Sequence, residues 1–268
     1  MTSIKIILQL SFILITCTGI AQRDTSKVNA IAKNQISVNI GPHLGYLKDL
    51  NYAVLNYREG GTVYGIQYQH LGRNLKHLFN GEVNFTSGHL DTRATSFFKT
   101  PFVQGNISLF FLFSVRQLSN KNMRVYAGPQ LNSFFQYMQW GEDMDSWNYL
   151  MVHGLNLALS SHYKLTERKS IITTLSIPVI SDLVRPPYNG FDEYIVQNQE
   201  ETLKIAFKGE PASLNKYMNV DCRFVYHYAL GGHADFTAGY LFRYQRIPGY
   251  NKLVHFQNQF SAGLTFKF

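Results

Sequence analysis

The sequence predicts an all-β fold, an antiparallel up-and-down transmembrane β-barrel of about ten strands. Three observations favour it. Apolar and polar residues alternate in ten successive segments, aromatic residues reach 15% of the chain while charged residues make up only 16%, and short and long connections alternate between the segments. Eight or twelve strands would also fit, because element boundaries read from one sequence shift by several residues.

The first residues resemble a secretory signal. Lys5 is the only early charge, the apolar run from Ile6 to Ile15 follows, and Gly19-Ile20-Ala21 ends in small residues of the kind that a signal peptidase reads. The run is shorter than the ~20 residues of a membrane-spanning helix. We therefore expect residues 1–21 to be a signal peptide cleaved after Ala21, and residues 22–34 to form a flexible periplasmic lead-in.

The two cysteines limit the covalent chemistry of the chain. Cys17 lies in the predicted signal, where lipidation is the alternative, although Thr16 is larger than the residue that usually precedes a lipidated cysteine. The mature chain then keeps Cys222 alone, which excludes an intramolecular disulfide and metal sites built on several cysteines.

Alternation with a period of two is the signal of a strand with two different faces. In a typical segment, Phe236, Ala238 and Tyr240 alternate with Asp235 and Thr237. We expect residues 35–268 to form the barrel. The ten alternating segments lie near 36–46, 64–69, 79–86, 103–113, 124–132, 151–159, 171–179, 218–228, 236–244 and 254–268.

The connections predict an up-and-down order that leaves both termini at one end of the barrel. Short turns and long links alternate in barrels of this kind, and one link, at 247–251, is short where a long one is due. Short turns are expected near 72–76, 117–121, 165–169 and 230–233, and long links near 48–61, 91–99, 138–148 and 181–213.

A soluble β-sandwich would also show alternation, but it would not carry so many Phe and Tyr residues at segment ends.

The formal charge of +8 could favour binding to anionic polysaccharide or to lipid phosphates. The basic residues are not clustered as in a nucleic-acid patch, and the secretion signal also argues against a nucleic-acid partner.

The last residues carry a family resemblance. Phe260-Ser261-Ala262-Gly263-Leu264-Thr265-Phe266-Lys267-Phe268 resembles the terminal strand of bacterial outer-membrane barrels, in which a final Phe is part of the signal read by the barrel-assembly machinery. Ala21-Gln22 and the Gly-Pro pairs at Gly41-Pro42 and Gly128-Pro129 are similar to barrels of the Bacteroidota. The resemblance implies an outer-membrane location among lipid and lipopolysaccharide, and implies no substrate.

Charged residues on the polar face of the strands predict a filled lumen, because small barrels enclose little more than their own side chains. The Gly231-Gly232 turn would set Asp221 opposite Arg243, and a short last link would bring His255 beside Arg243. We interpret the charges as a salt-bridged plug; a selective or gated conduit is the alternative. The inward set is Glu82, Arg124, Asp221, Arg223, Asp235, Arg243 and His255.

Two constellations could carry hydrolytic chemistry. Omptin proteases are ten-stranded barrels with an Asp pair and an Asp-His pair at the outer rim, and the two predicted links here hold Asp143 with Asp145 and His89 with Asp91. The match is imperfect, because His89 precedes Asp91 and the links belong to neighbouring hairpins.

The second constellation is Ser133 and His153. If the fifth and sixth strands pair around residue 143, these residues face each other on the lipid side, where a Ser activated by a His could attack an ester. Barrel lipid hydrolases instead place His and Ser two apart on one strand. The alternative is that His153 belongs to an interfacial aromatic belt with Trp140, Trp147 and Tyr149.

The link at 181–213 is the third candidate region, because a connection this long is either functional or disordered. Pro186 and Pro187 exclude a sheet interior there. Arg185, Tyr188, Phe191 and Tyr194 are its candidate binding residues, since aromatic rings could stack on sugars or simply fix the link in place.

The sequence therefore favours a barrel without enzymatic activity, whose outer loops bind a ligand or partner, or which serves as a narrow conduit or a component of an envelope complex. The alternative is an outer-membrane hydrolase, either a lipid esterase or deacylase or an omptin-like protease. No phosphate-binding glycine loop or metal-ligand spacing is present in the sequence, so we expect no cofactor and no metal.

Overall fold

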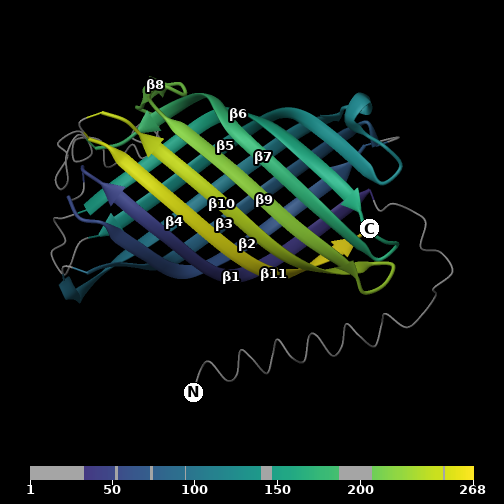
Figure 1. Ribbon diagram of the computed structural model, residues 1–268, viewed down its shortest axis with the longest axis horizontal. Coiled ribbons are helices and arrows are strands. Elements are labelled where there is room, and N and C mark those ends of the chain that lie inside the picture. Colours follow the sequence, from purple (N-terminus) through teal and green to yellow (C-terminus); the bar gives the residue numbers. More distant parts are fainter. Residues whose placement is uncertain are drawn as a thin grey trace, which may run out of the picture.

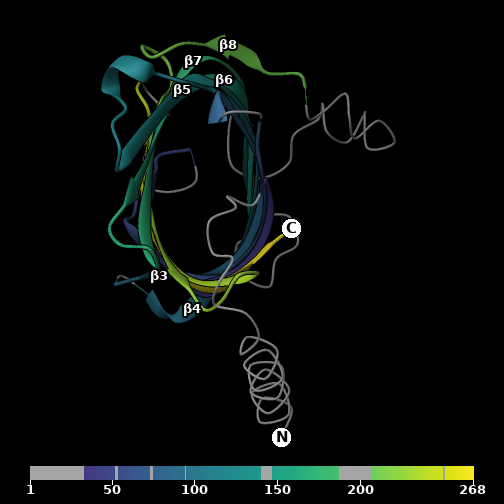
Figure 2. The ribbon, with the colours of Figure 1, turned by 90° about the vertical axis from the view of Figure 1, so that its right-hand side faces the viewer.

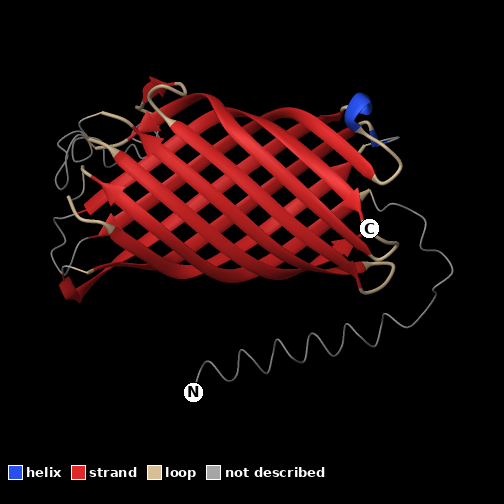
Figure 3. Ribbon diagram, in the orientation of Figure 1, coloured by secondary structure: helices blue, strands red, loops and turns tan. Residues whose placement is uncertain are grey.

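The computed structural model describes residues 33–51, 54–72, 75–93, 95–139, 147–186, 207–249 and 251–268, with the backbone alone for 95–99 and 147. Most of the described residues are in strands, and the strands run obliquely across a closed barrel (Figures 1 and 3). Viewed along the barrel, they form an oval ring (Figure 2). The predicted signal peptide, residues 1–21, lies outside the described residues.

Ten long strands form the wall, as the alternation predicts. They have 12 to 20 residues each, more than the 9–11 that cross a bilayer. They are β1 (Asn34–Asp49), β2 (Tyr57–Leu71), β3 (His77–Thr92), β4 (Thr95–Ser114), β5 (Met123–Gln139), β6 (Trp147–Lys164), β7 (Lys169–Val184), β9 (Met218–Ala229), β10 (Ala234–Ile247) and β11 (Leu253–Lys267).

The sheet is antiparallel throughout and closes on itself. Each strand pairs with its neighbour in the chain, β7 pairs with β9, and β1 closes the ring by pairing with β11 from Gln35↔Lys267 to Asp49↔Leu253. A short strand, β8 (Glu210–Ala212), pairs with β7 beyond the β7–β9 ladder. Closure removes the open edges that lipid could not satisfy.

Both described ends of the chain lie at the same end of the barrel, where the amide of Asn34 donates to the carbonyl of Phe268 at 3.2 Å. We call this the terminal end and the opposite one the distal end. The distal end carries Asp49, the start of β2, the end of β7 and the start of β11.

The distal links are shorter than the sequence predicts. The expected link at 91–99 is wrong, because β3 runs to Thr92 and β4 starts at Thr95, so two residues connect them. Likewise β1 extends to Asp49 and β2 starts at Tyr57, inside the expected link at 48–61, while β7 and β8 occupy both ends of the expected link at 181–213. Alternation is masked near strand ends, where apolar side chains face inward and polar ones such as Arg58 and Asp91 face outward.

The outer face of the wall is apolar over the middle of the strands. Aromatic rings contact across strands near the distal end, where Tyr244 and Phe256 have centroids 4.8 Å apart, and near the terminal end, where Phe79 and Phe111 are 5.2 Å apart. A third contact, Tyr240 with Phe260 at 5.0 Å, lies between them. This apolar exterior is what lipid requires of a barrel wall. Exposed outward residues include Val38, Ile40, Ile66, Val83, Ile107, Leu131, Leu157, Val179 and Phe260.

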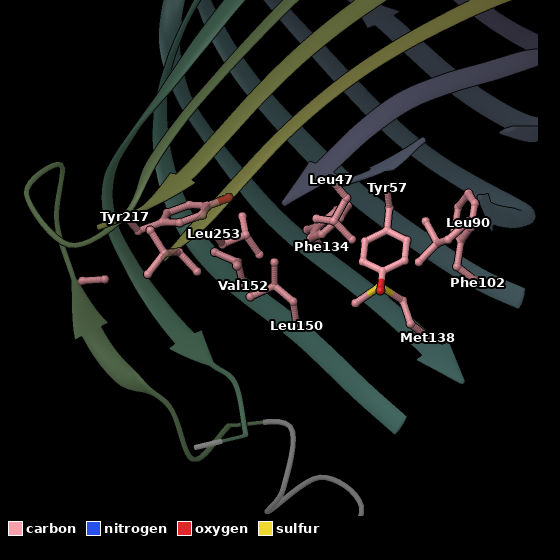
Figure 4. Packing of buried hydrophobic residues seen from close by; sticks show 12 residues of the cluster. Leu47, Tyr57, Leu90, Phe102, Phe134, Met138, Leu150, Val152, Tyr217 and Leu253 are labelled. Atoms are coloured by element: carbon pink, nitrogen blue, oxygen red, sulfur yellow. The ribbon is translucent and has the colours of Figure 1, made fainter. Parts of the chain in front are cut away.

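Two apolar layers occupy the two ends of the interior. At the distal end, Tyr57, Phe102 and Met138 pack with the first and last residues of neighbouring strands, as Figure 4 shows. At the terminal end, Leu71, Tyr126 and neighbours form a smaller cluster. The segment between the layers is lined by polar side chains. Apolar residues at both ends of the inward face interrupt the simple pattern of a polar lumen.

A 3-10 turn, η2 (Arg116–Leu118), connects β4 and β5. No helix in the described ranges is both long enough and apolar enough to cross a membrane.

Candidate functional site

The interior ion pair that the β9–β10 turn predicts is formed. Register places Arg243 directly opposite Asp221. Arg243 Nε donates to Asp221 Oδ1 and Arg243 Nη2 donates to Asp221 Oδ2, both at 2.8 Å. Arg243 as a whole is only 3% exposed. The guanidinium carbon Cζ of Arg243 also lies 5.1 Å from the centroid of the Phe134 ring. This is a buried bidentate pair of the strong class.

A second ion pair crosses the lumen. Arg223 on β9 donates through both terminal nitrogens to the carboxylate of Glu82 on β3. Following the ring order β3-β2-β1-β11-β10-β9, these strands are five steps apart, which is half of a ten-stranded ring. Arg243 Nη2 likewise reaches Asn106 Oδ1 on β4, at 3.2 Å. The polar layer therefore braces opposite walls against each other.

A fully buried carboxylate, Glu59, forms the centre of a third cluster toward the distal end. His43 Nε2 lies 2.9 Å from Oε2 and His255 Nε2 lies 2.9 Å from Oε1, and all three side chains are 0% exposed. Gln136 Nε2 donates to Oε1 at 3.2 Å. Register puts Glu59 opposite Gly45, and a Cβ on Gly45 would approach Glu59 Oε2 to 2.3 Å, so the cluster needs a glycine there.

Sequence reasoning missed this cluster. Glu59 fell in the expected link at 48–61, so it was not assigned to a strand. His43 could have been found, because it alternates with the outward residues Ile40 and Leu44 and must therefore face the lumen. His43 and Glu59 lie on the paired strands β1 and β2, whereas the contact of Glu59 with His255 on β11 depends on closure of the ring, which one sequence does not display.

One expectation about the charge network is wrong. His255 does not lie beside Arg243: register sets Gln257 opposite Arg243 and His255 opposite Gln245, because β10 and β11 pair as far as Ile247↔Leu253 around a tight link. Arg124 lies one residue into β5 at the terminal end and is exposed. Asp235 is also at that end, where Lys267 Nζ donates to it at 2.6 Å.

An ion pair and hydrogen bonds around Asp49 connect different strands at the distal mouth of the barrel. Arg185, just after β7, pairs with the Asp49 carboxylate at the end of β1. Asn148 on β6 donates to Asp49 Oδ2 at 3.2 Å, and Asn51 Nδ2 donates to the carbonyl of Pro186 at 2.7 Å. Burial lowers the pKa of the Arg185 guanidinium, while the neighbouring carboxylate of Asp49 raises it. The long link therefore begins by crossing the mouth.

Little open space remains inside. Two cavities within the polar layer each have a volume of about 50 Å³, enough for a few water molecules. They are lined by Gln67, Arg223 and their neighbours, and Leu78, Phe110 and Leu112 of the terminal-end cluster also line the first of them. Among the described residues, the side chains fill the barrel.

On the outer wall, Ser133 and His153 meet as the sequence predicts. Register sets them directly opposite each other on β5 and β6, and Ser133 Oγ lies 2.9 Å from His153 Nδ1. The next strand extends the row, because His153 is also opposite Asp182 on β7. Asp182 lay in an expected link and was not a sequence candidate. Tyr149, predicted to share an exposed belt with His153, is 6% exposed.

This row borders a groove of about 510 Å³ on the outer wall. The volume is within the range of ligand pockets. Apolar side chains make most of its floor, and the polar groups gather around His153. Phe207 covers one side, with its ring centroid 4.7 Å from that of His153. The lining includes Ile107, Leu109, Leu131, Ser133, His153, Leu155, Ile180, Asp182 and Pro211.

The protease constellation is not assembled within the described residues. His89 and Asp91 lie in β3 rather than in a link, and both are exposed on the face opposite to buried Leu90, so they point away from the lumen. Asp143 and Asp145 lie outside the described residues, as do Tyr188, Phe191, Tyr194 and Trp140.

Comparisons with known proteins support the fold. No protein-family model and no curated protein sequence matches the chain. Among solved structures, the chain resembles the outer membrane protease OmpT from Escherichia coli with a TM-score of 0.58 at 8% identity, covering 90% of this chain and all of that one. Neisserial surface protein A is also similar, with a TM-score of 0.37 at 11% identity over 88% of this chain and 97% of that one. At this identity the OmpT likeness shows the fold alone: a closed ten-stranded barrel of the outer-membrane type.

Proposed function

We propose that this chain is an outer-membrane β-barrel with a sealed lumen. In this proposal the long link at 181–213, at the distal end of the barrel, binds a ligand or an envelope partner. The filled interior carries the proposal: a cross-braced polar layer lies between two apolar clusters. A barrel filled in this way has no path for solute among the described residues. Any binding function is therefore assigned to the ends of the barrel and to its outer wall.

The outer-membrane location is supported by the apolar exterior and by the fold. A closed sheet with its apolar face outward is one of the few structures that satisfies its backbone in lipid. The terminal Phe268 and the signal-like first 21 residues are expected to direct secretion and assembly. The lumen charges are structural in this proposal, and the narrow conduit is the alternative.

The network on Asp49 supports a role for the link at 181–213. Arg185 and Pro186 are held at the mouth by Asp49 and Asn51, so the link starts from a fixed point. A rigid base lowers the entropy lost when a loop is ordered on binding. The proposal assigns binding to the aromatic and acidic residues between Pro186 and Phe207, which lie outside the described residues.

Single-channel recording on the refolded mature chain tests the sealed lumen. We expect a silent bilayer for the wild type over voltages at which open porins conduct. A matched variant that removes the brace between opposite walls, Glu82→Ala with Arg223→Ala, should show leak events if the plug is what seals the barrel. Steady conductance by the wild type would overturn the sealed lumen and favour the conduit.

Display of the link is tested separately in cells that express the chain. Replacing residues 188–205 with a Gly-Ser linker should leave heat-modifiable gel mobility and outer-membrane fractionation unchanged, while a specific crosslinked adduct of the wild type is lost. The control replaces the turn at 231–232, at the terminal end. An unchanged adduct pattern would contradict the link as the binding element.

A further inference from the structure

The row of Ser133, His153 and Asp182 on the outer wall goes beyond a sealed binding barrel. We propose that it is a serine esterase site for the long-chain acyl ester of a membrane lipid, with the adjacent apolar groove holding the acyl chain. The inference rests on the outer wall and is independent of what the lumen or the long link does.

The nucleophile and its base are already in contact. Ser133 Oγ lies 2.9 Å from His153 Nδ1, within the range expected of a nucleophile and its general base. A serine hydroxyl that donates to an imidazole nitrogen loses its proton to that nitrogen as it attacks a carbonyl carbon. Both residues are partly buried rather than fully exposed, which limits competition by water for this hydrogen bond.

Asp182 occupies the position of a third member. It is directly opposite His153 on the far side from Ser133, so the three residues form one outward row across β5, β6 and β7. Directly opposite residues in an antiparallel pair have Cβ atoms about 4.5–5.5 Å apart, within side-chain reach. Its carboxylate lies against Gly209, where a Cβ would meet Oδ1 at 2.4 Å. A negative charge at this place favours the imidazolium that forms during catalysis, which makes Asp182 a positioning residue.

The groove supplies binding for an acyl chain. Its floor is built from leucine and isoleucine side chains of β4 to β7, including Leu109, Leu131 and Leu155, and it has a volume of about 510 Å³. The polar row lies at one border, and Phe207 packs over His153 from the segment that precedes β8. An apolar pocket with a few convergent polar groups is the usual form of a site for an amphipathic ligand.

The row lies in the distal half of the wall, nearer to the distal headgroups than to those at the terminal end. Six residues separate Ser133 from Gln139, the distal end of β5, which is about 15 Å along the axis at a rise of about 3.4 Å and a tilt of about 40°. The 17 residues of β5 span about 43 Å on the same basis, more than the apolar band of about 25 Å. If the band is centred, Ser133 lies about 6 Å inside its distal edge, among the upper part of the acyl chains, so a lipid must sink by about that depth to bring its ester to Ser133.

The reaction balances without a further reagent. Ser133 Oγ forms a bond to the ester carbonyl carbon while His153 Nδ1 takes its proton, and the carbon–oxygen bond to the lipid alcohol then breaks as His153 returns the proton to the leaving oxygen. A water molecule next gives a proton to His153 and its oxygen attacks the acyl carbon. The serine oxygen leaves and regains the proton, and the products are a fatty acid and a deacylated lipid.

The first experiment traps the nucleophile. The refolded mature chain in detergent micelles is incubated with a long-chain alkyl fluorophosphonate, and the labelled residue is identified by mass spectrometry. We expect label on Ser133, none in Ser133→Ala, and labelling slowed on the order of 100-fold in His153→Gln, a typical contribution of a general base. Ser161→Ala is the matched control, because Ser161 is on the same side of β6 opposite Val125 and Thr173 and should label as the wild type does.

The second experiment separates the two sources of the ester. Vesicles of phosphatidylethanolamine and micelles of lipid A are each incubated with the wild type and Ser133→Ala, and released fatty acid is measured. Release from one substrate, lost in Ser133→Ala, identifies that lipid; Asp182→Asn should slow it about tenfold and shift its pH profile. No release from either lipid, or labelling at Ser133 that is insensitive to His153→Gln, would overturn the proposal, whereas a conducting lumen would leave it intact.

Discussion

Two ion pairs inside this barrel have the same chemistry but different origins. Asp221 and Arg243 come from adjacent strands of one hairpin, whereas Glu82 and Arg223 come from opposite walls. The first pair can form once β9 meets β10, while the second forms only when the ring has closed. The comparison shows that a neighbouring pair fixes strand register and a cross-lumen pair fixes the cross-section of the barrel.

The hairpin pair should give the largest effect. Arg243→Ala leaves Asp221 buried without its cation, and removing one partner of a buried pair costs about 3–5 kcal/mol. The contacts to Asn106 and the Phe134 ring are lost as well. Denaturant unfolding of the refolded barrel in detergent measures the loss.

The double variant with Asp221→Ala distinguishes pairing from packing. It should recover part of the loss, because no uncompensated charge is left, and the double-mutant cycle gives the coupling directly. Zero coupling would show that water solvates both charges, which contradicts a sealed polar layer at this level.

Glu59→Gln should have a smaller effect than the Arg243 truncation. The amide keeps the size of the carboxylate and can still hydrogen-bond to the neighbouring side chains, so the change leaves poorly matched polar groups rather than an unpaired arginine or aspartate. Leaving a buried donor or acceptor unsatisfied costs about 1–3 kcal/mol. Unfolding should show a loss in that range, with Glu167→Gln as control because its pair with Lys164 is exposed. A loss as large as that of Arg243→Ala would mean that the negative charge of Glu59, and not only its hydrogen bonds, stabilises the cluster.

The same contrast explains what the sequence could predict. Alternation shows which face each strand turns inward, and a tight turn such as Gly231-Gly232 fixes the register of its hairpin, so Asp221 opposite Arg243 could be derived. Ser133 opposite His153 could be predicted only by assuming that the fifth and sixth strands pair around residue 143. The ten strands and their antiparallel order follow from the same two rules. Contacts between opposite walls, such as Glu82 with Arg223, depend on the closed ring and have no local signal.

The ends of the strands were the least predictable part. Apolar side chains such as Tyr57 and Leu253 face inward at the distal end, so alternation there no longer separates lumen from lipid. Glu59 and Asp182 were consequently assigned to links, although both lie in strands. Two of the groups most relevant to function were therefore hidden by the same local loss of pattern.

The cross-lumen pair gives the last and smallest effect, and it sharpens the comparison through kinetics. The side chain of Arg223 is 22% exposed and lines both small cavities, so water can replace part of the lost interaction and the coupling with Glu82 should be about 1 kcal/mol. Because this pair needs a closed ring, Arg223→Ala should speed unfolding while leaving the folding rate nearly unchanged. A contact absent from the transition state affects the unfolding rate alone.

Arg243→Ala should slow folding as well as speed unfolding, if the β9–β10 hairpin forms before closure. Folding and unfolding rates of both variants in lipid vesicles measure the difference. Equal slowing of folding by both would show that opposite walls meet as early as neighbouring strands pair, and would remove the distinction between register and closure.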